Sequence, residues 1–120
     1  DDWPTFDGTC IRDYIHVMDL ANAHIAALKF IMNSSPIFMN LNIGTGYGKS
    51  ILEVVETFKK VNNCQLDYIF DSRRDGDAPY VVADNFLALS KLNWKPMRNL
   101  DDMCRDAWRW KKNHYNDKVN

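Results

Sequence analysis

The chain has 120 residues, of which 46% are apolar and 26% are charged, and its formal net charge is -1. These proportions are typical of one globular domain, and the small net charge argues against nucleic acid or an anionic membrane as a partner. The three cysteines lie far apart and are odd in number, so neither paired zinc ligands nor a disulfide framework fits. No apolar run reaches the roughly twenty residues that span a bilayer. We therefore expect one domain over residues 1–120 of a reduced, cytoplasmic protein without a metal.

The first predicted strand covers residues 10–15, after a turn at Asp7-Gly8. Strand alternation places Arg12 and Tyr14 on one face and Asp13 on the other. A guanidinium beside a tyrosine suits an anionic ligand such as a phosphate ester, because the guanidinium offers a fixed fork of donors. The alternative is that Arg12 and Asp13 are ordinary surface charges.

Hydrophobic periodicity predicts four helices and further short strands in the remaining chain. The predicted helices cover residues 17–32, 51–61, 85–92 and 100–113, with Ser50, Asp84 and Asn99 as caps and Asp19 in the first turn of the first helix. The predicted strands cover residues 38–43, 66–70 and 80–83, and the polar segment 71–79 is predicted to be a loop. The polar tail after His114 is expected to fray. The fold class is therefore mixed α/β, with short strands and about four helices.

The segment Gly44-Thr45-Gly46-Tyr47-Gly48-Lys49-Ser50 has the composition of a nucleotide-binding loop but not the spacing. A phosphate loop requires glycine at position 43, which is Ile43, and the dinucleotide pattern requires glycine at position 49, which is Lys49. The structural interpretation is a turn from strand into helix, in which Ser50 caps the helix and Glu53 completes a capping box.

Catalytic patterns are scarce, and the residues alone indicate a binding protein. The histidines lack metal-ligand spacing, and we interpret His16 as a fixed hydrogen-bond partner. Arg12 and Arg74, supported by Asp77 and Tyr14, could form a half-shell for a nucleoside diphosphate, because two guanidinium forks match its charge and a carboxylate accepts ribose hydroxyls. The alternative is an exposed ion pair within the loop, from Arg73 or Arg74 to a neighbouring aspartate.

Four segments resemble, in order and spacing, the C-terminal portion of the UDP-glucose 4-epimerase family, also called UDP-galactose 4-epimerases. They are DGTCIRDYIHVMDLANAHIAAL, NLNIGTGYGKSILEVVETF, RRDGDAPYVVAD and LNWKPMRNLDDMCRDAWRW, and they cover residues 7–110. The RDYIHVxD and RRxGD segments carry the specificity of the resemblance. The chain also begins without methionine, and we expect it to be a fragment of a longer enzyme.

The resemblance implies a small C-terminal substrate-binding domain of an extended short-chain dehydrogenase/reductase. Such an enzyme acts in galactose metabolism: it moves hydride from sugar C4 to NAD and returns it to the opposite face. NAD would be held by a missing N-terminal Rossmann domain, and the parent enzyme would be a homodimer. The family's catalytic tyrosine and lysine form a YxxxK pattern, and none of the five tyrosines here precedes a lysine at that offset. This chain alone should therefore be inactive.

The resemblance also assigns substrate-binding residues. Arg12 and Arg74 match the two arginines that contact the diphosphate, Asp77 matches the acid that reaches the ribose, and Tyr14 matches a tyrosine near the nucleoside. Val81 falls where family members carry tyrosine or a smaller residue, and a smaller side chain implies tolerance for UDP-N-acetylhexosamines. Tyr80 lies next to that position and could shift the match by one residue.

Other functions are compatible with the same residues. The same diphosphate shell would serve a related nucleotide-sugar epimerase acting on a pentose, or a dehydratase. The chain could also be a non-catalytic nucleotide-sugar-binding module, or a fragment with a structural role.

Overall fold

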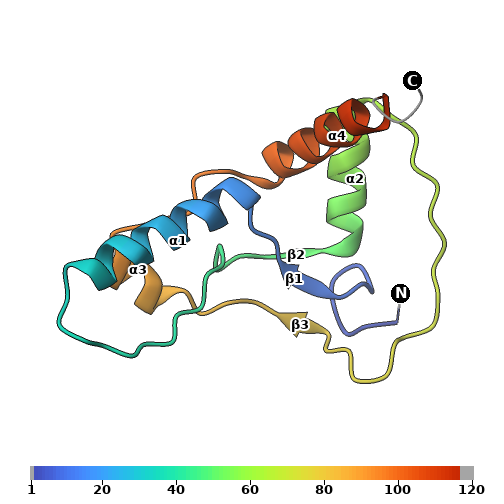
Figure 1. The fold of residues 1–120 in the computed structure, drawn as a ribbon. Helices are drawn as coiled ribbons and strands as arrows, with labels where there is room; N and C mark the ends of the chain where they lie inside the picture. The colour runs from blue at the N-terminus through green and yellow to red at the C-terminus, as the bar shows by residue number, and fades with distance from the viewer. Residues whose placement is uncertain (1, 117–120) are drawn as a thin grey trace.

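A small three-stranded sheet lies at the centre of the computed structural model, which describes residues 2–116 (Figure 1). The strands are β1 (Ile11–Asp13), β2 (Gly48–Ser50) and β3 (Tyr80–Val81), in the order β2-β1-β3. β1 pairs antiparallel with β2 and parallel with β3. The strand predicted over residues 10–15 is thus confirmed in a shorter form, and so is the strand near residue 80.

Four helices flank this sheet in two pairs. α1 (Val17–Met32) packs with α3 (Phe86–Leu92), and α2 (Ile51–Asn62) packs with α4 (Leu100–Asn116). Figure 1 shows the two pairs at opposite ends of the sheet. The mixed α/β class with four helices is confirmed, and α1 has the bounds that its periodicity predicts.

Side chains at the helix starts explain these boundaries. Ser50 Oγ accepts the Glu53 amide at 3.0 Å, and Glu53 Oε2 accepts the Ser50 amide at 2.9 Å, which is the predicted capping box of α2. Asn99 and Asp102 form the same reciprocal pair at α4, at 3.0 and 3.2 Å. The prediction for α3 starts one residue early, because Asn85 precedes the helix and its side chain donates to the Gly44 carbonyl at 2.9 Å. The predicted cap Asp84 does accept a helix-start amide, that of Phe86, at 3.2 Å.

The hydrophobic core is small. Ala23, Leu92 and Trp94 form its buried centre, and the Trp94 indole donates to the backbone oxygen of Asp19 at 3.1 Å. The radius of gyration is 17.5 Å, whereas a compact chain of this length would have about 14 Å. The molecule is therefore open.

A buried carboxylate joins α1 to the connection before α4. Asp19 is 1% exposed, and its Oδ2 accepts the amides of Met97 at 2.9 Å and Arg98 at 2.8 Å. Its Oδ1 accepts from the Arg98 guanidinium at 2.6 Å. The sequence predicts that Asp19 stabilises the free amides of its own helix, but the structure directs it to a distant segment.

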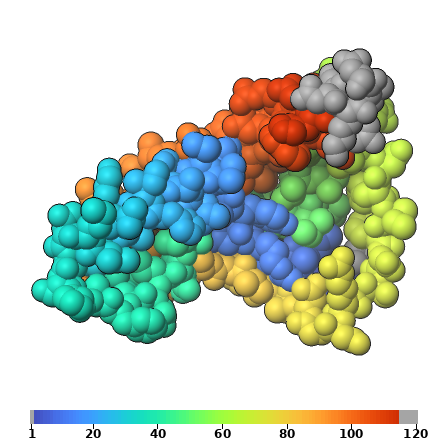
Figure 2. Space-filling model, in the orientation of Figure 1, coloured from blue at the N-terminus to red at the C-terminus, as the bar shows by residue number. Residues whose placement is uncertain are grey.

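Two predicted strands are wrong. Residues 38–43 and 66–70 form no regular secondary structure and pair with no strand among residues 2–116. Phe38 is 88% exposed and Ile69 is 90% exposed. The segment after α2, yellow-green to yellow in Figure 2, forms one edge of the molecule in that view. Side chains that favour strands do not form one without a neighbouring strand.

The described part of the chain contains no helix long and apolar enough to cross a membrane. In the tail for which fraying is predicted, α4 continues to Asn116, and residues 117–120 lie outside the described residues.

Candidate substrate-binding site

Strand pairing gathers three of the relevant side chains on one face of the sheet. Arg12 is the register partner of Lys49 on β2 and of Val81 on β3. Directly opposed residues in neighbouring strands point to the same face, with Cβ atoms about 5 Å apart. The sheet therefore places the guanidinium between a lysine and the half-exposed Val81 side chain.

The Arg12 guanidinium pairs with Asp77 across 65 positions of sequence. Its Nη2 donates to Asp77 Oδ1 at 2.8 Å, and its Nη1 donates to the backbone oxygen of Ile11 at 2.8 Å. The pair brings the polar loop 71–79 against β1. This loop leads directly into β3. Arg12 and Asp77, which the sequence analysis groups together, are thus in contact.

Arg74 lies in the same loop, in a turn closed by the Asp77 amide donating to the Arg74 carbonyl at 3.2 Å. Its neighbour Arg73 pairs with Asp2 at 2.5 Å and stacks on the Trp3 ring at 4.0 Å from its centroid. Arg73 and Asp77 therefore form ion pairs with residues outside the loop. The alternative interpretation expects ion pairs within the loop. Arg74 is exposed, three residues from Asp77.

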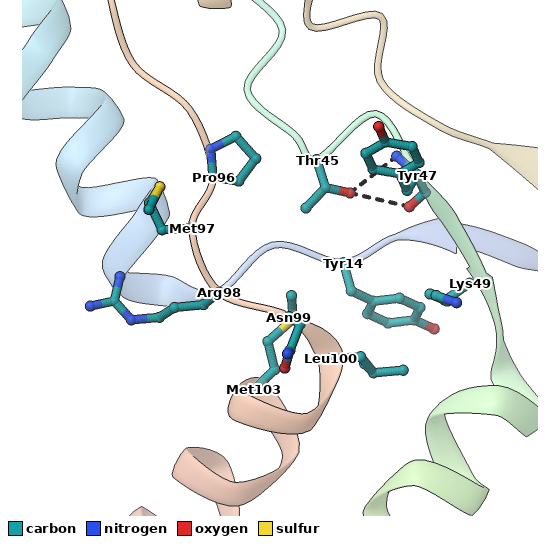
Figure 3. A pocket seen from close by; sticks show the side chains of 10 residues that line it. All are labelled: Tyr14, Thr45, Tyr47, Lys49, Pro96, Met97, Arg98, Asn99, Leu100 and Met103. Atoms are coloured by element: carbon teal, nitrogen blue, oxygen red, sulfur yellow. Dashed lines mark hydrogen bonds between the residues drawn. The ribbon is translucent and has the colours of Figure 1, made fainter.

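Tyr14 lies in a hollow beside this face, where β1 passes the start of α4 (Figure 3). The hollow has a volume of about 340 Å³ and is lined by Tyr14, Thr45, Tyr47, Lys49, Pro96, Met97, Arg98, Asn99, Leu100 and Met103. Burial raises the pKa of the Tyr14 hydroxyl, with a smaller contribution from Cys10, and Arg12 offsets this only in part. The hydroxyl is therefore protonated at neutral pH and available as a donor. Arg12, Arg74 and Asp77 do not line this hollow.

The glycine-rich segment 44–50 does not fit the dinucleotide pyrophosphate of NAD. A Cβ on Gly44 would lie 2.5 Å from Asp13 Oδ2 and 2.6 Å from Ala83 Cβ. A Cβ on Gly48 would lie 2.8 Å from Val82 Cγ2 and closer still to Ile11. The space beside these two glycines is occupied by the protein's own side chains, so it cannot hold a phosphate. The glycine spacing argues against a nucleotide-binding loop, and the close packing around Gly44 and Gly48 supports that conclusion.

Asp13 is a positioning residue that the sequence analysis treats only as a possible surface charge. Its carboxylate accepts the amides of Thr45 at 2.9 Å, Gly46 at 2.9 Å and Ala83 at 3.3 Å, and also the Thr45 hydroxyl. It thereby holds the ends of β2 and β3 around β1. The available signal was that strand alternation places Asp13 on the same face as Ile11 and Ile15, since a charge on an apolar face needs partners.

His16 is buried and fully engaged. Its Nδ1 accepts the Met18 amide at 3.1 Å, so the neutral ring carries its proton on Nε2, which lies 3.1 Å from Asp106 Oδ2. The prediction of a fixed hydrogen-bond partner is confirmed. Among residues 2–116 no cluster of histidine, cysteine or acidic side chains could hold a metal ion.

The architecture is that of the small α/β domain of an extended short-chain dehydrogenase/reductase. No family model matches the sequence. The chain is 45% identical over 115 residues to a UDP-glucose 4-epimerase of Bacillus subtilis, an alignment that covers 96% of this chain and 34% of that protein. The chain is thus related to the UDP-glucose 4-epimerases, and it spans about a third of the length of the curated relatives it matches. A C-terminal portion fits this coverage.

Solved structures agree with this relationship. The UDP-glucose 4-epimerase of Stenotrophomonas maltophila, with bound NAD and formylated UDP-arabinopyranose, superposes with a TM-score of 0.90 at 44% identity, over 97% of this chain and 34% of that one. The enzyme of Bifidobacterium longum, in complex with NAD+ and UDP, gives a TM-score of 0.88 at 39% identity over the same shares. Related structures therefore carry ligands of the chemical class that the sequence analysis expects.

Proposed function

We propose that this chain is the substrate-binding portion of an NAD-dependent UDP-glucose/UDP-galactose 4-epimerase. The observation that carries the proposal is the contact between Arg12 and Asp77, which come from distant parts of the sequence and meet on one face of the sheet. The similarity to UDP-glucose 4-epimerases over nearly the whole chain supports it. A structural ion pair alone would not need Arg12 to lie beside Lys49, because like charges side by side destabilise a sheet.

In this proposal Arg12 and Arg74 bind the diphosphate of the UDP-sugar. Arg12 keeps further N–H donors for an anion beyond those given to Ile11 and Asp77. Asp77 exchanges its contact with Arg12 for a ribose hydroxyl, and the protonated Tyr14 lies near the nucleoside. Val81 faces the same side of the sheet as Arg12 and, being smaller than tyrosine, leaves room for an N-acetylated sugar.

The remainder of the proposed enzyme supplies what these residues do not. The described residues offer no fit for NAD, so we assign NAD and the catalytic tyrosine and lysine to a Rossmann domain outside this chain. We further propose that the parent enzyme is a cytoplasmic homodimer. The 120-residue chain by itself is then a binding module without turnover.

A chimera tests this function. The chain replaces the corresponding third of the Bacillus subtilis enzyme, to which it is 45% identical, and conversion of UDP-galactose to UDP-glucose is measured. We expect activity in the chimera and a loss of at least about a hundredfold with Arg74→Ala, since one charge-assisted diphosphate contact is removed from a closed site. A folded chimera without activity, or an Arg74→Ala chimera with full activity, would refute the proposal.

The same chimera tests the role of Val81. Val81→Tyr should reduce activity on UDP-N-acetylhexosamines selectively, because the larger ring occupies the space of the acetyl group. Equal losses on acetylated and unacetylated sugars would reject this role. Tyr80→Phe is the matched control, since Tyr80 is the register partner of Ile11 and lies on the other face.

A further inference from the structure

Lys49 stands out as a charge without a role in the proposed function. It is the register partner of Arg12, so two cations lie side by side on one partly exposed face of the β1–β2 pair. Like charges in this arrangement destabilise a sheet. Each is balanced by a separate carboxylate: Asp77 contacts Arg12 and Glu53 contacts Lys49, at 2.8 and 3.0 Å.

The carboxylate that balances Lys49 also has a structural task. Glu53 Oε1 accepts from the Lys49 amine, while Oε2 accepts the Ser50 amide in the capping box of α2. The capping contact would persist without the ammonium, because it uses the other oxygen. Lys49 can therefore leave Glu53 without uncapping the helix.

The Lys49 side chain is also placed to meet a ligand. It is 44% exposed, and it lines the hollow that contains Tyr14 (Figure 3). It borders a second hollow towards α2 and α4, together with Glu53 and Asn99. Lys49 is thus adjacent both to Arg12, assigned above to the diphosphate, and to the hollow of Tyr14, which is assigned to the nucleoside.

We propose that Lys49 is a third cation of the diphosphate site, held by Glu53 in the free protein and transferred to the bound anion. An anion between Lys49 and Arg12 removes their mutual repulsion, which is the physical reason for the exchange. The lysine amine is suited to this role because it acts as a mobile point charge on a flexible stem. This inference rests on the proposed function, since it concerns the same ligand.

The inference is tested by measuring UDP binding to the chain through amide chemical shifts, which detect weak complexes. Uridine serves as the control ligand because it lacks phosphate. We expect Lys49→Met to weaken UDP binding about threefold to tenfold, Lys49→Arg to retain it, and uridine binding to be unchanged in both. Glu53→Gln keeps a capping oxygen and releases Lys49, so it should tighten UDP binding. The matched control is Lys59→Met, which removes a lysine paired with Glu56 at 3.0 Å on α2.

The outcomes separate this inference from the function on which it rests. Unchanged UDP affinity in Lys49→Met, with a loss in Arg12→Met, would overturn the role of Lys49 and leave the proposed function intact. Equal weakening of UDP and uridine would also overturn it, because a phosphate contact cannot act on a ligand without phosphate. No UDP binding by the unaltered chain would overturn the role of Lys49 in this chain, whereas the chimera described above decides the proposed function.

Discussion

Residues 80–81 and residues 66–70 have similar side chains but different structures. Tyr80 and Val81 form β3 beside β1, whereas Leu66-Asp67-Tyr68-Ile69-Phe70, with the stronger strand pattern, pairs with no described strand. The difference is the presence of a neighbour, because Asp77 and Asp13 attach the chain on both sides of β3 to β1. In this molecule strand formation follows from tertiary contacts more than from residue preference.

The same contrast separates segments that are hydrogen-bonded to distant parts of the chain from segments with exposed side chains such as 38–43 and 66–70. The largest effect of a substitution is expected at Asp19, which joins α1 to the connection before α4. Asp19→Ala leaves the amides of Met97 and Arg98 and a guanidinium without their acceptor. We expect the free energy of unfolding to fall by about 3 kcal/mol or more, measured by urea denaturation. Asp19→Asn, which keeps one acceptor oxygen, should cost less. A loss below about 1 kcal/mol in Asp19→Ala would contradict the anchoring role.

Acid provides a second measurement of this anchor. Burial raises the pKa of Asp19, but the amides of Arg98 and Met97 and the Arg98 guanidinium outweigh burial and lower it below 3.8. A lowered pKa in the folded state means that the stabilisation is complete above about pH 4 and is lost as the pH falls through the folded value. Asp7 and Glu53 shift in the same direction. The dependence of stability on pH below 4 should therefore weaken, but not vanish, in Asp19→Ala.

An intermediate effect is expected where the strands pack closely. Gly48→Ala would place a methyl group 2.8 Å from Val82 and closer to Ile11, and we expect a cost of about 2–3 kcal/mol in urea denaturation. Gly76→Ala is the control, because nothing lies within 4 Å of its Cβ and only its φ of +81° opposes the change. That control should cost about 1 kcal/mol. Equal costs would show that crowding around β2 is not decisive.

The smallest effect on the free energy of unfolding is expected at the exposed side chains of segments 38–43 and 66–70. Phe38→Ser and Ile69→Ser should change the free energy of unfolding by no more than about 0.5 kcal/mol, because these side chains are already exposed to water. Leu41→Ser is the control, since Leu41 packs against the core cluster and its loss should be larger. A cost above about 1 kcal/mol for Phe38 or Ile69 would mean that these side chains are packed in solution.

Much of the candidate site could be predicted, for local reasons. Strand alternation places Arg12 and Tyr14, and glycine spacing rejects a nucleotide loop, since both depend on near neighbours in sequence. Lys49 could not be assigned, because its place beside Arg12 depends on the register of two strands that are 35 residues apart or more. The contact between Arg12 and Asp77 was expected only as a shared ligand shell, and the direct ion pair required the fold.

The sequence by itself determined the helices and the caps of α2 and α4, because a capping box such as Ser50 and Glu53 and a 3.6-residue apolar period are satisfied within a few residues. Only the tertiary structure decided which extended segments became strands, where the Asp19 carboxylate was directed, and which charges meet on the sheet face. A strand or a buried charge is stabilised by groups that are distant in sequence, and their positions are fixed only when the chain folds.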